Sequence, residues 1–395
     1  MNTALLITSV ALLAGSSHAV STQRPSTNIE VDQETHLISC ISVQSPPKVE
    51  VVFVLDTTGS MGGLIESAKE KIWSIATTIA QAQPSPEIRM GLVAYRDRGD
   101  DYITKRTELT EDLDALYSEL SSFEARGGGD GPESVNQALF EAVERFGWTE
   151  GEDVLRIVYL VGDAPPKMSF EDDVKYPASC KFAREKGILI NTIQCGSMGG
   201  TKEVWQTIAQ NTNGQYAAIA QDGGTRSIAT PYDDEIKELD QELSSLMLDY
   251  GDSRTLKTQA MKRERSFTLS ESVADEAAAD RAVYNQSLAG RSNLYGRQEL
   301  VNDYFEGKVT LAEIPQGHLP TTLQDKPETE IIEIITANQS QRQEIAARLG
   351  ELAISRRDFQ TKAREEAPIS GFDARVVEIL IEQAAAIGLK IQNEE

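Results

Sequence analysis

The sequence predicts an α/β fold, namely a doubly wound and mostly parallel sheet followed by an all-helical C-terminal region. Short runs of apolar, largely β-branched residues recur along the first 220 residues, and amphipathic stretches separate them. Beyond residue 250 the strand patterns stop and only helical spacing continues. Strands that are apolar on both faces and alternate with helices are typical of an open parallel sheet with helices on both sides.

The first strand is expected at residues 49–55, which are apolar except for Glu50. A helix is expected at 64–81, because its apolar residues recur at helical spacing. The same reasoning predicts strands at 88–95, 103–109, 156–162, 188–195 and 214–220, and helices at 112–123, 133–146, 174–186, 201–211 and from about residue 233.

The C-terminal region is expected to contain helices at 274–288 and 298–305, a long helix at 328–366 and a final helix at 372–389. The last two suggest a helical hairpin. Polar residues interrupt the apolar stripe of the long helix, which favours packing within the chain over a long coiled coil. These interruptions are Asn338, Arg342 and Arg356.

The N-terminus resembles a secretory signal. Residues 4–15 form one apolar run, and Ser17-His18-Ala19 follows with small residues at the positions that a signal peptidase reads. An uncleaved apolar tail is the alternative. We expect a signal peptide at 1–19, a leader at 20–47, an α/β domain at 48–250 and the helical region at 251–395. The mature protein would be periplasmic or extracellular, and no later run is long and apolar enough to span a bilayer.

The composition excludes some functions and leaves one question about the cysteines. The 62 acidic residues outnumber the 38 basic ones, for a net charge of −24. This balance argues against binding to nucleic-acid phosphates or to an anionic membrane. The cysteines are Cys40, Cys180 and Cys195. A disulfide between the last two is one possibility in an oxidising compartment, and buried free thiols are the other.

Hard oxygen ligands gather where two expected strands end. Asp56, Thr58 and Ser60 follow the first strand, and Asp163 follows the strand at 156–162. In an open α/β sheet the carboxyl ends of the strands form the binding edge, so these groups should lie together. Carboxylate and hydroxyl oxygens suit Mg²⁺, Mn²⁺ or Ca²⁺. A glycine-rich loop at 127–133 adds further carboxylates before a helix.

At these residues the chain resembles the von Willebrand factor type A (VWA) family. The metal-ion-dependent adhesion site of that family reads Asp-x-Ser-x-Ser, then a distant Thr and a distant Asp. Asp56-x-Thr58-x-Ser60 and Asp163 match the first and last parts. The resemblance implies that Thr58 and Ser60 bind a divalent cation directly, and that both aspartates bind it directly or through water. An acidic group of a protein partner would complete the site.

The distant Thr of the family has no obvious counterpart, and the matching loop offers Asp130 instead. Asp130 would add negative charge to a site for Mg²⁺, our first expectation, or for Ca²⁺ or Mn²⁺. The alternative for Asp130 is a loop carboxylate that caps the next helix. The loop at 127–133, together with residues 95–100 and 192–196, resembles a bacterial exported subset of the family.

We expect a binding protein, not an enzyme, that mediates metal-dependent adhesion or protein–protein interaction. A structural envelope protein that acts through its helices is the first alternative. A metal-dependent hydrolase with Asp130 or Glu133 as its base is the second, but no motif for a transition-state-stabilising group accompanies these carboxylates. Arg98-Gly99-Asp100 spells the tripeptide that integrins read, and we interpret it as a charged loop.

Overall fold

The computed structural model describes residues 46–129, 131–225, 227–366 and 371–391, which belong to one compact unit. The expected signal peptide, most of the leader, Cys40 and Asp130 lie outside these residues. Within them, no helix combines the length and the apolar character that crossing a bilayer requires.

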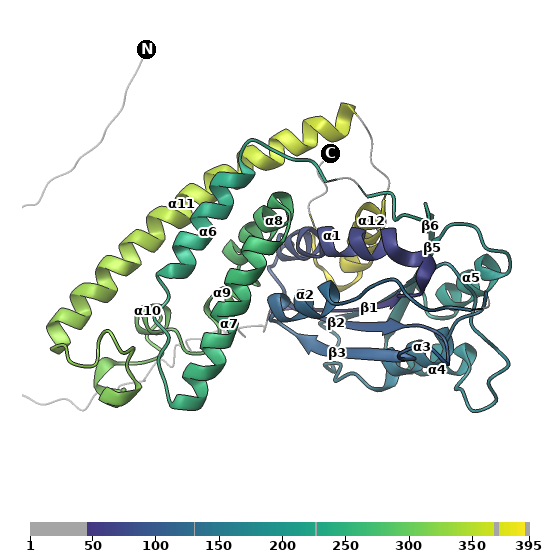
Figure 1. Cartoon of the computed structure of the whole chain (residues 1–395), viewed down its shortest axis with the longest axis horizontal. Coiled ribbons are helices and arrows are strands. Elements are labelled where there is room, and N and C mark those ends of the chain that lie inside the picture. The colour runs from purple at the N-terminus through teal and green to yellow at the C-terminus, as the bar shows by residue number, and fades with distance from the viewer. Residues whose placement is uncertain (1–45, 130, 226, 367–370, 392–395) are drawn as a thin grey trace, which may run out of the picture. The chain divides into compact units, whose positions relative to one another are not determined.

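A six-stranded sheet forms the centre of the fold, as the sequence predicts (Figure 1). The strand order is β3-β2-β1-β4-β5-β6, and only β3, at one edge, runs antiparallel to its neighbour. The central strand β1 is buried along almost its whole length. The strands are β1 (Lys48–Asp56), β2 (Glu87–Tyr95), β3 (Thr104–Thr110), β4 (Val154–Gly162), β5 (Ile188–Cys195) and β6 (Tyr216–Ile219).

Alternate residues of β1 enter two separate apolar clusters, one on each face of the sheet. Val51 and Phe53 pack with helices α1, α2 and α12, whereas Val52 and Val54 pack with α3, α4 and α5. The period of two along a strand explains this division. The helices are α1 (Gly62–Ala80), α2 (Leu113–Ser121), α3 (Val135–Glu144), α4 (Tyr176–Glu185), α5 (Thr201–Asn211) and α12 (Phe372–Ala384), with short 3-10 helices η1 (Gly59–Met61) and η4 (Ala385–Ile387).

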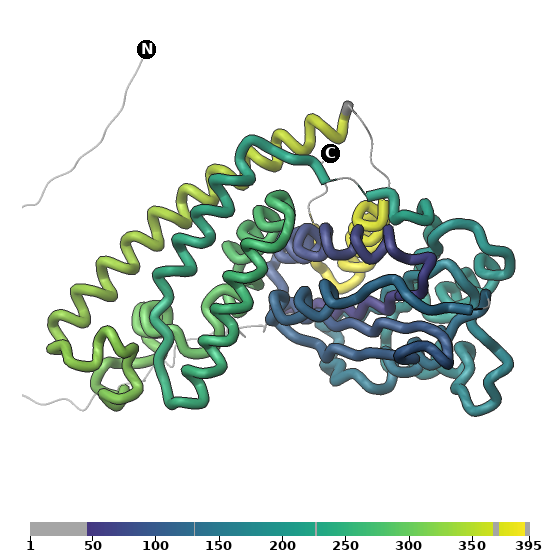
Figure 2. The backbone as a smooth tube through the Cα atoms, in the orientation of Figure 1, coloured from purple at the N-terminus to yellow at the C-terminus, as the bar shows by residue number. Residues whose placement is uncertain are grey.

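The remaining helices lie between β6 and α12 in the chain. They are α6 (Asp233–Ser245), α7 (Ser253–Ser272), α8 (Asp275–Gln286), α9 (Arg291–Tyr295), α10 (Leu300–Phe305) and α11 (Glu328–Glu366), with η2 (Leu311–Glu313) and η3 (Gln316–His318). The first and last, α6 and α11, run side by side (Figure 2). Sequence analysis missed α7, because the helix buries polar residues, among them Gln259 and Lys262, in place of an apolar stripe.

The polar residues that interrupt the stripe of α11 bind other helices of the same chain. Arg342 donates to both carboxylate oxygens of Glu299, at 2.7 and 2.9 Å. Arg356 donates to Asp233 and to Asp280, at 2.6 Å each. Both guanidinium groups are buried, and a buried charge is costly unless a group of opposite charge pairs with it, as these carboxylates do. The structure thus confirms packing within the chain.

A third buried arginine ties these helices to the layer that covers the sheet. Arg281 of α8 donates to both oxygens of Asp114 in α2 and to Asp240 in α6. The Arg281 guanidinium keeps the pKa of the fully buried Asp114 below its usual value, although burial opposes this. Removing either partner would leave an uncompensated charge in the interior.

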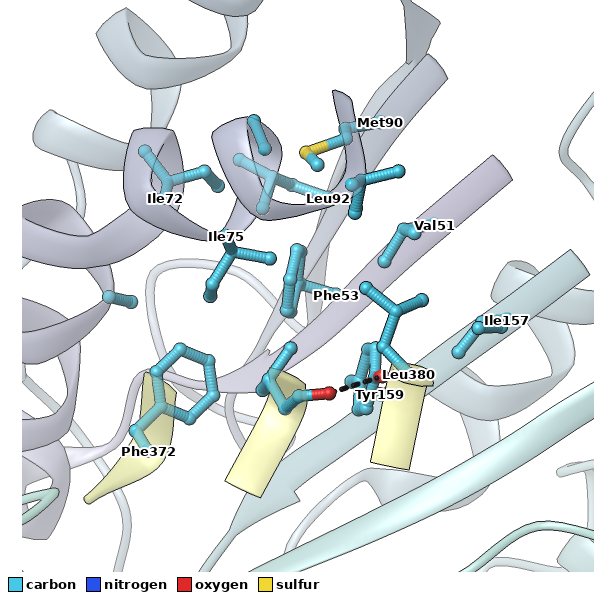
Figure 3. Close-up of a cluster of buried hydrophobic side chains, with 14 of the residues drawn as sticks. Val51, Phe53, Ile72, Ile75, Met90, Leu92, Ile157, Tyr159, Phe372 and Leu380 are labelled. Carbon is cyan, nitrogen blue, oxygen red and sulfur yellow. Dashed lines mark hydrogen bonds between the residues drawn. The ribbon is translucent and has the colours of Figure 1, made fainter. Parts of the chain in front are cut away.

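The last helix, α12, packs on the sheet. Phe372 lies 6.1 Å from Phe53 between ring centroids, and Tyr159 of β4 donates to the carbonyl of Val376 (Figure 3). We expected α12 to form a hairpin with α11, but it contacts α1 and β4 while α11 packs along α6 and α8. The reason is that the apolar face of α12 completes the core on one side of β1.

The two ends of the segment α6–α11 lie next to each other. Phe372 donates its backbone N–H to the carbonyl of Gly223, and a Cβ at Gly371 would lie 2.7 Å from the carbonyl oxygen of Gly224. The α6–α11 segment is therefore an insertion between β6 and the helix that closes the sheet. We call it the helical insertion.

The two described cysteines are free thiols. Cys195 of β5 packs in the cluster with α1 and α12, and Cys180 of α4 packs in the cluster on the other face of the sheet. Burial raises the pKa of the Cys180 thiol to about 12. Of the two possibilities that the sequence left open, the structure has the buried free thiols.

Replacing Phe372 by Ala should lower the free energy of unfolding by about 3–5 kcal/mol, because the side chain is fully buried in the core of the sheet. The matched control is Phe359→Ala on α11, which is 41% exposed and should change it by no more than about 0.5 kcal/mol. Urea titration measures both. A loss below about 1 kcal/mol for Phe372→Ala would mean that α12 does not belong to the core.

Candidate metal centre

The sheet brings Asp56 and Asp163 to one edge. Strands β1 and β4 are parallel neighbours in which Leu55 pairs with Val161. Asp56 is therefore the last residue of one strand, and Asp163 follows the end of the next. Both carboxylates are buried. The register of the two strands therefore brings Asp56 and Asp163 to the same edge, where we expected them to lie.

The turn after β1 places two hydroxyls beside Asp56. Its Oδ1 accepts hydrogen bonds from the backbone N–H of Thr58 at 2.9 Å and from the Thr58 hydroxyl at 2.6 Å. The hydroxyls of Thr58 and Ser60 lie 3.5 Å apart, and Ser60 is exposed in η1, just before α1. Asp56 Oδ2 is buried and has no hydrogen-bond partner among the described residues.

Gln221 is a member of this site that sequence analysis missed. Its Nε2 donates to Asp163 Oδ2 at 2.7 Å and to the carbonyl of Ser60 at 3.3 Å. The hydroxyl of Thr201, at the start of α5, donates to the carbonyl of Asp163 at 3.0 Å. Gln221 follows the short strand β6, and nothing in the local sequence distinguishes it from an ordinary loop glutamine.

Glu133 faces the same site from the glycine-rich loop. A Cβ at Gly128 would lie 3.1 Å from Glu133 Oε1 and 3.2 Å from Cβ of Thr58, so the two residues approach the loop backbone closely from both sides. The backbone N–H of Glu133 donates to the carbonyl of Pro165, which fastens the loop to the segment after Asp163. Glu133 Oε2 is buried without a partner among the described residues. The sequence pointed to Asp130 as a ligand and to Asp130 or Glu133 as a base. The described structure brings Glu133 to Thr58, and Asp130 lies outside the described residues.

Burial, together with the charges of neighbouring carboxylates, raises the pKa of two carboxylates at the site. Burial raises the pKa of Asp56 to about 7, and the charge of Asp163 adds to this. Burial also raises the pKa of Glu133 to about 9, with contributions from Asp56, Asp97 and Asp100. Ionising these groups together is therefore unfavourable unless a positive charge enters the site.

Asp100 and Arg98 hold the neighbouring loops in place. Asp100 Oδ2 accepts from the backbone N–H groups of Asp97 and Gly128, and Gly128 has a positive φ of 76°. Arg98 forms ion pairs with Asp172 and Asp173. Both charged residues of the Arg98-Gly99-Asp100 tripeptide are thus engaged within the fold, as the interpretation of a charged loop requires.

Gly162 leaves room for the polar groups beneath the site. A Cβ on Gly162 would lie 2.4 Å from the Tyr95 hydroxyl, 2.9 Å from Cβ of Asp56 and 3.1 Å from Asp56 Oδ2. The Tyr95 hydroxyl is buried and has no partner among the described residues. Any larger residue would fill the space that Asp56 and Tyr95 share.

These groups fit a divalent cation. Two buried carboxylate oxygens have no partner, two hydroxyls lie within reach of each other, and every donor is a hard oxygen. Among the described residues no three His, Cys, Asp or Glu side chains are placed to hold an ion by themselves, so an ion at this edge would also need the hydroxyls.

The α/β part is similar to known proteins. Residues 50–231 match the family model of the von Willebrand factor A domain. An ariadne-like RING finger protein of Acanthamoeba polyphaga mimivirus is 31% identical over 147 residues, or 36% of this chain and 13% of that protein. Von Willebrand factor A domain-containing protein 7 of Rattus norvegicus is 33% identical over 124 residues, or 31% of this chain and 13% of that protein. The chain thus spans only about an eighth of these relatives.

Among solved structures, an aerotolerance-related membrane protein from Bacteroides fragilis aligns at 18% identity with a TM-score of 0.30, over 44% of this chain and 92% of that one. Proximal thread matrix protein 1 from the mussel byssus aligns at 15% identity with a TM-score of 0.36, over 45% of this chain and 43% of that one.

Without a divalent cation, the raised pKa values should make the protein less stable as the pH rises. The folded state keeps protons on Asp56 up to about pH 7 and on Glu133 up to about pH 9. The unfolded chain releases the same protons near pH 4, so stability falls between about pH 4 and pH 9. Melting temperatures in EDTA at pH 5, 7 and 9 measure this fall.

The control is the Glu133→Gln variant. Its side chain at position 133 cannot ionise, so the variant should lose less stability between pH 5 and 9 than the wild type. Mg²⁺ should raise the wild-type melting temperature most at pH 9, where both carboxylates can ionise. Parallel pH profiles for the variant and the wild type would contradict the assignment.

Proposed function

We propose that this chain, which contains a von Willebrand factor A domain in residues 50–231, binds a divalent cation at the carboxyl edge of its sheet and uses it to hold a protein partner. The observation that carries the proposal is the pair of buried carboxylate oxygens, Asp56 Oδ2 and Glu133 Oε2, left without partners beside two hydroxyls. An interior carboxylate in this condition is costly unless a cation or a proton compensates it.

Thr58 and Ser60 would bind the cation through their hydroxyls, and Asp56 and Asp163 would bind it directly or through water. When bound, the cation supplies a positive charge that can attract an acidic side chain of a partner. Asp56 Oδ1 orients the Thr58 hydroxyl through its 2.6 Å hydrogen bond, and Gln221 orients Asp163. Asp130 stays a candidate ligand outside the described residues.

Mg²⁺ is the cation that we propose first, because two hydroxyls and few protein ligands leave positions for water. Ionised Glu133 would add a carboxylate and favour Ca²⁺, which accepts more oxygen ligands. Mn²⁺ has similar ligand preferences. The apolar N-terminal run supports a location outside the cytoplasm for this interaction, in the periplasm or beyond the cell.

We propose a binding role and not a catalytic one. A metal-dependent hydrolase needs a positively charged or hydrogen-bonding group aimed at the charge that develops in the transition state. The basic side chains of the neighbouring loops are already engaged: Lys167 binds Asp97, and Arg98 binds Asp172 and Asp173. Glu133 as a base would therefore act without such a group.

A structural envelope protein that acts through its helical insertion is the second candidate. The observation that favours it is the number of buried ion pairs in the insertion, centred on Arg281, Arg342 and Arg356, which hold its helices in one arrangement. In that case the cation would only stabilise the domain.

Thr58→Val should weaken Mg²⁺ binding at least tenfold, which corresponds to about 1.4 kcal/mol, because it removes a hydroxyl ligand and keeps the shape of the side chain. The matched control is Thr207→Val, whose hydroxyl binds the carbonyl of Glu203 on an exposed helix surface. Isothermal titration calorimetry measures both. If Thr58→Val binds Mg²⁺ as tightly as the control does, the proposed site is wrong.

Removing residues 226–370 and joining Thr225 to Gly371 should leave Mg²⁺ binding unchanged, because the two ends are adjacent and α12 stays in place. Truncation after residue 250 is not an equivalent experiment, since it also removes α12 from the core. Calorimetry on the shortened chain tests this expectation. Loss of Mg²⁺ binding in a shortened chain that still unfolds cooperatively would argue against a self-contained site.

A further inference from the structure

We infer that Met168 and Met198 form an apolar rim that receives an aromatic side chain of the partner, next to the partner carboxylate. The inference rests on the proposed function, because the cation is what attracts that carboxylate. It goes further by adding a second chemical feature of the partner, an aromatic side chain, to the carboxylate. We call these two residues the methionine rim.

Two large apolar side chains are exposed on the described α/β part of the protein, and both lie in loops at the carboxyl edge of the sheet. Within the described residues of 46–231, Met168 and Met198 are the two exposed large apolar side chains, at 48% and 42%. Met168 lies in the loop after β4 and Met198 in the loop after β5, so both stand at the carboxyl edge of the sheet. Exposed apolar groups gathered beside a polar site are typical of an interaction surface.

Hydrogen bonds tie Met168 to the candidate metal centre. The preceding residue, Lys167, donates its backbone N–H to the carbonyl of Glu133 at 2.8 Å. The Met168 sulfur accepts from Nδ2 of the fully buried Asn136 at 3.5 Å. Asn136 is itself held, since its Oδ1 accepts from the backbone N–H of Tyr176 at 2.8 Å. The exposed thioether therefore has a defined position next to Glu133.

Met198 is linked through Thr201 to the backbone of Asp163. Its carbonyl accepts from the backbone N–H of Thr201, and the Thr201 hydroxyl donates to the carbonyl of Asp163. The Met198 sulfur lies 3.4 Å from the position of a Cβ on Gly131, which places it against the glycine-rich loop. The two residues of the methionine rim thus lie in the loops after β4 and β5, and Met198 borders the glycine-rich loop.

The chemistry of the rim indicates what it contacts. Methionine is unbranched and polarisable, and its sulfur makes favourable contacts with aromatic rings. The acidic edge repels a carboxylate until a cation is bound, so the partner carboxylate and the cation belong together. A segment with Asp or Glu within two positions of Phe, Tyr or Trp would satisfy both the cation and the rim.

The test uses a random peptide library displayed on phage, selected on the full chain in Mg²⁺ and eluted with EDTA. We expect the eluted peptides to place an acidic residue within two positions of an aromatic one. Fluorescence polarisation of the labelled peptides then gives Kd for the wild type and for Met168→Gln/Met198→Gln, which keeps the side-chain length and removes the thioether. The double variant should raise Kd at least tenfold and leave the Mg²⁺ affinity unchanged.

The matched control is Met261→Gln on α7, whose side chain is 55% exposed outside the α/β part and which should leave Kd unchanged. An unchanged Kd in the double variant, or eluted peptides without aromatic residues, would overturn the methionine rim alone. Absence of Mg²⁺ binding in calorimetry would overturn the proposed function as well. A Mg²⁺-dependent dimer in sedimentation that the double variant abolishes would assign the rim to a second copy of this chain and overturn a peptide partner.

Discussion

Burial of the central strand on both faces is the constraint on which the structure depends. β1 is apolar on both sides, so it needs two helical layers, and each layer takes alternate residues of the strand. One layer consists of α3, α4 and α5, which lie between β3 and β6 in the chain. The other is incomplete until α12 returns to it after the whole helical insertion. The same burial excludes water from Asp56, the last residue of the strand.

At the edge where β1 ends, burial leaves carboxylate oxygens without hydrogen-bond partners in the part of the chain that the structure describes. Asp56 and Glu133 each leave one carboxylate oxygen without a partner, and burial raises the pKa of both side chains. Other buried carboxylates of the described residues are matched at close range, among them Asp114 with Arg281. Unpartnered carboxylate oxygens gathered at the edge of a sheet are expected where a fold keeps a site for a ligand.

The helical insertion follows a different physical logic from the sheet. Arginine side chains reach across it to carboxylates on other helices, and polar residues occupy positions that an apolar stripe would otherwise fill. Buried ion pairs of this kind contribute little net stability, but they disfavour arrangements that leave a charge unpaired. The insertion is therefore fixed in one packing, with both ends held beside Gly223 and Gly224.

The sequence predicts the sheet more completely than it predicts the groups of the site. Apolar runs of β-branched residues determined the strands, the order of helices between them and the place of Asp56 and Asp163, because burial on both faces leaves a local pattern in the sequence. Helix α7 left no such pattern, and neither did the return of α12 to the sheet. Gln221 and Glu133 are polar loop residues whose neighbours come from distant segments. The sequence by itself thus determined the fold class and the first two carboxylates, and only tertiary structure decided which other groups face them, because hydrogen bonding and burial at a sheet edge depend on segments that are far apart in the chain.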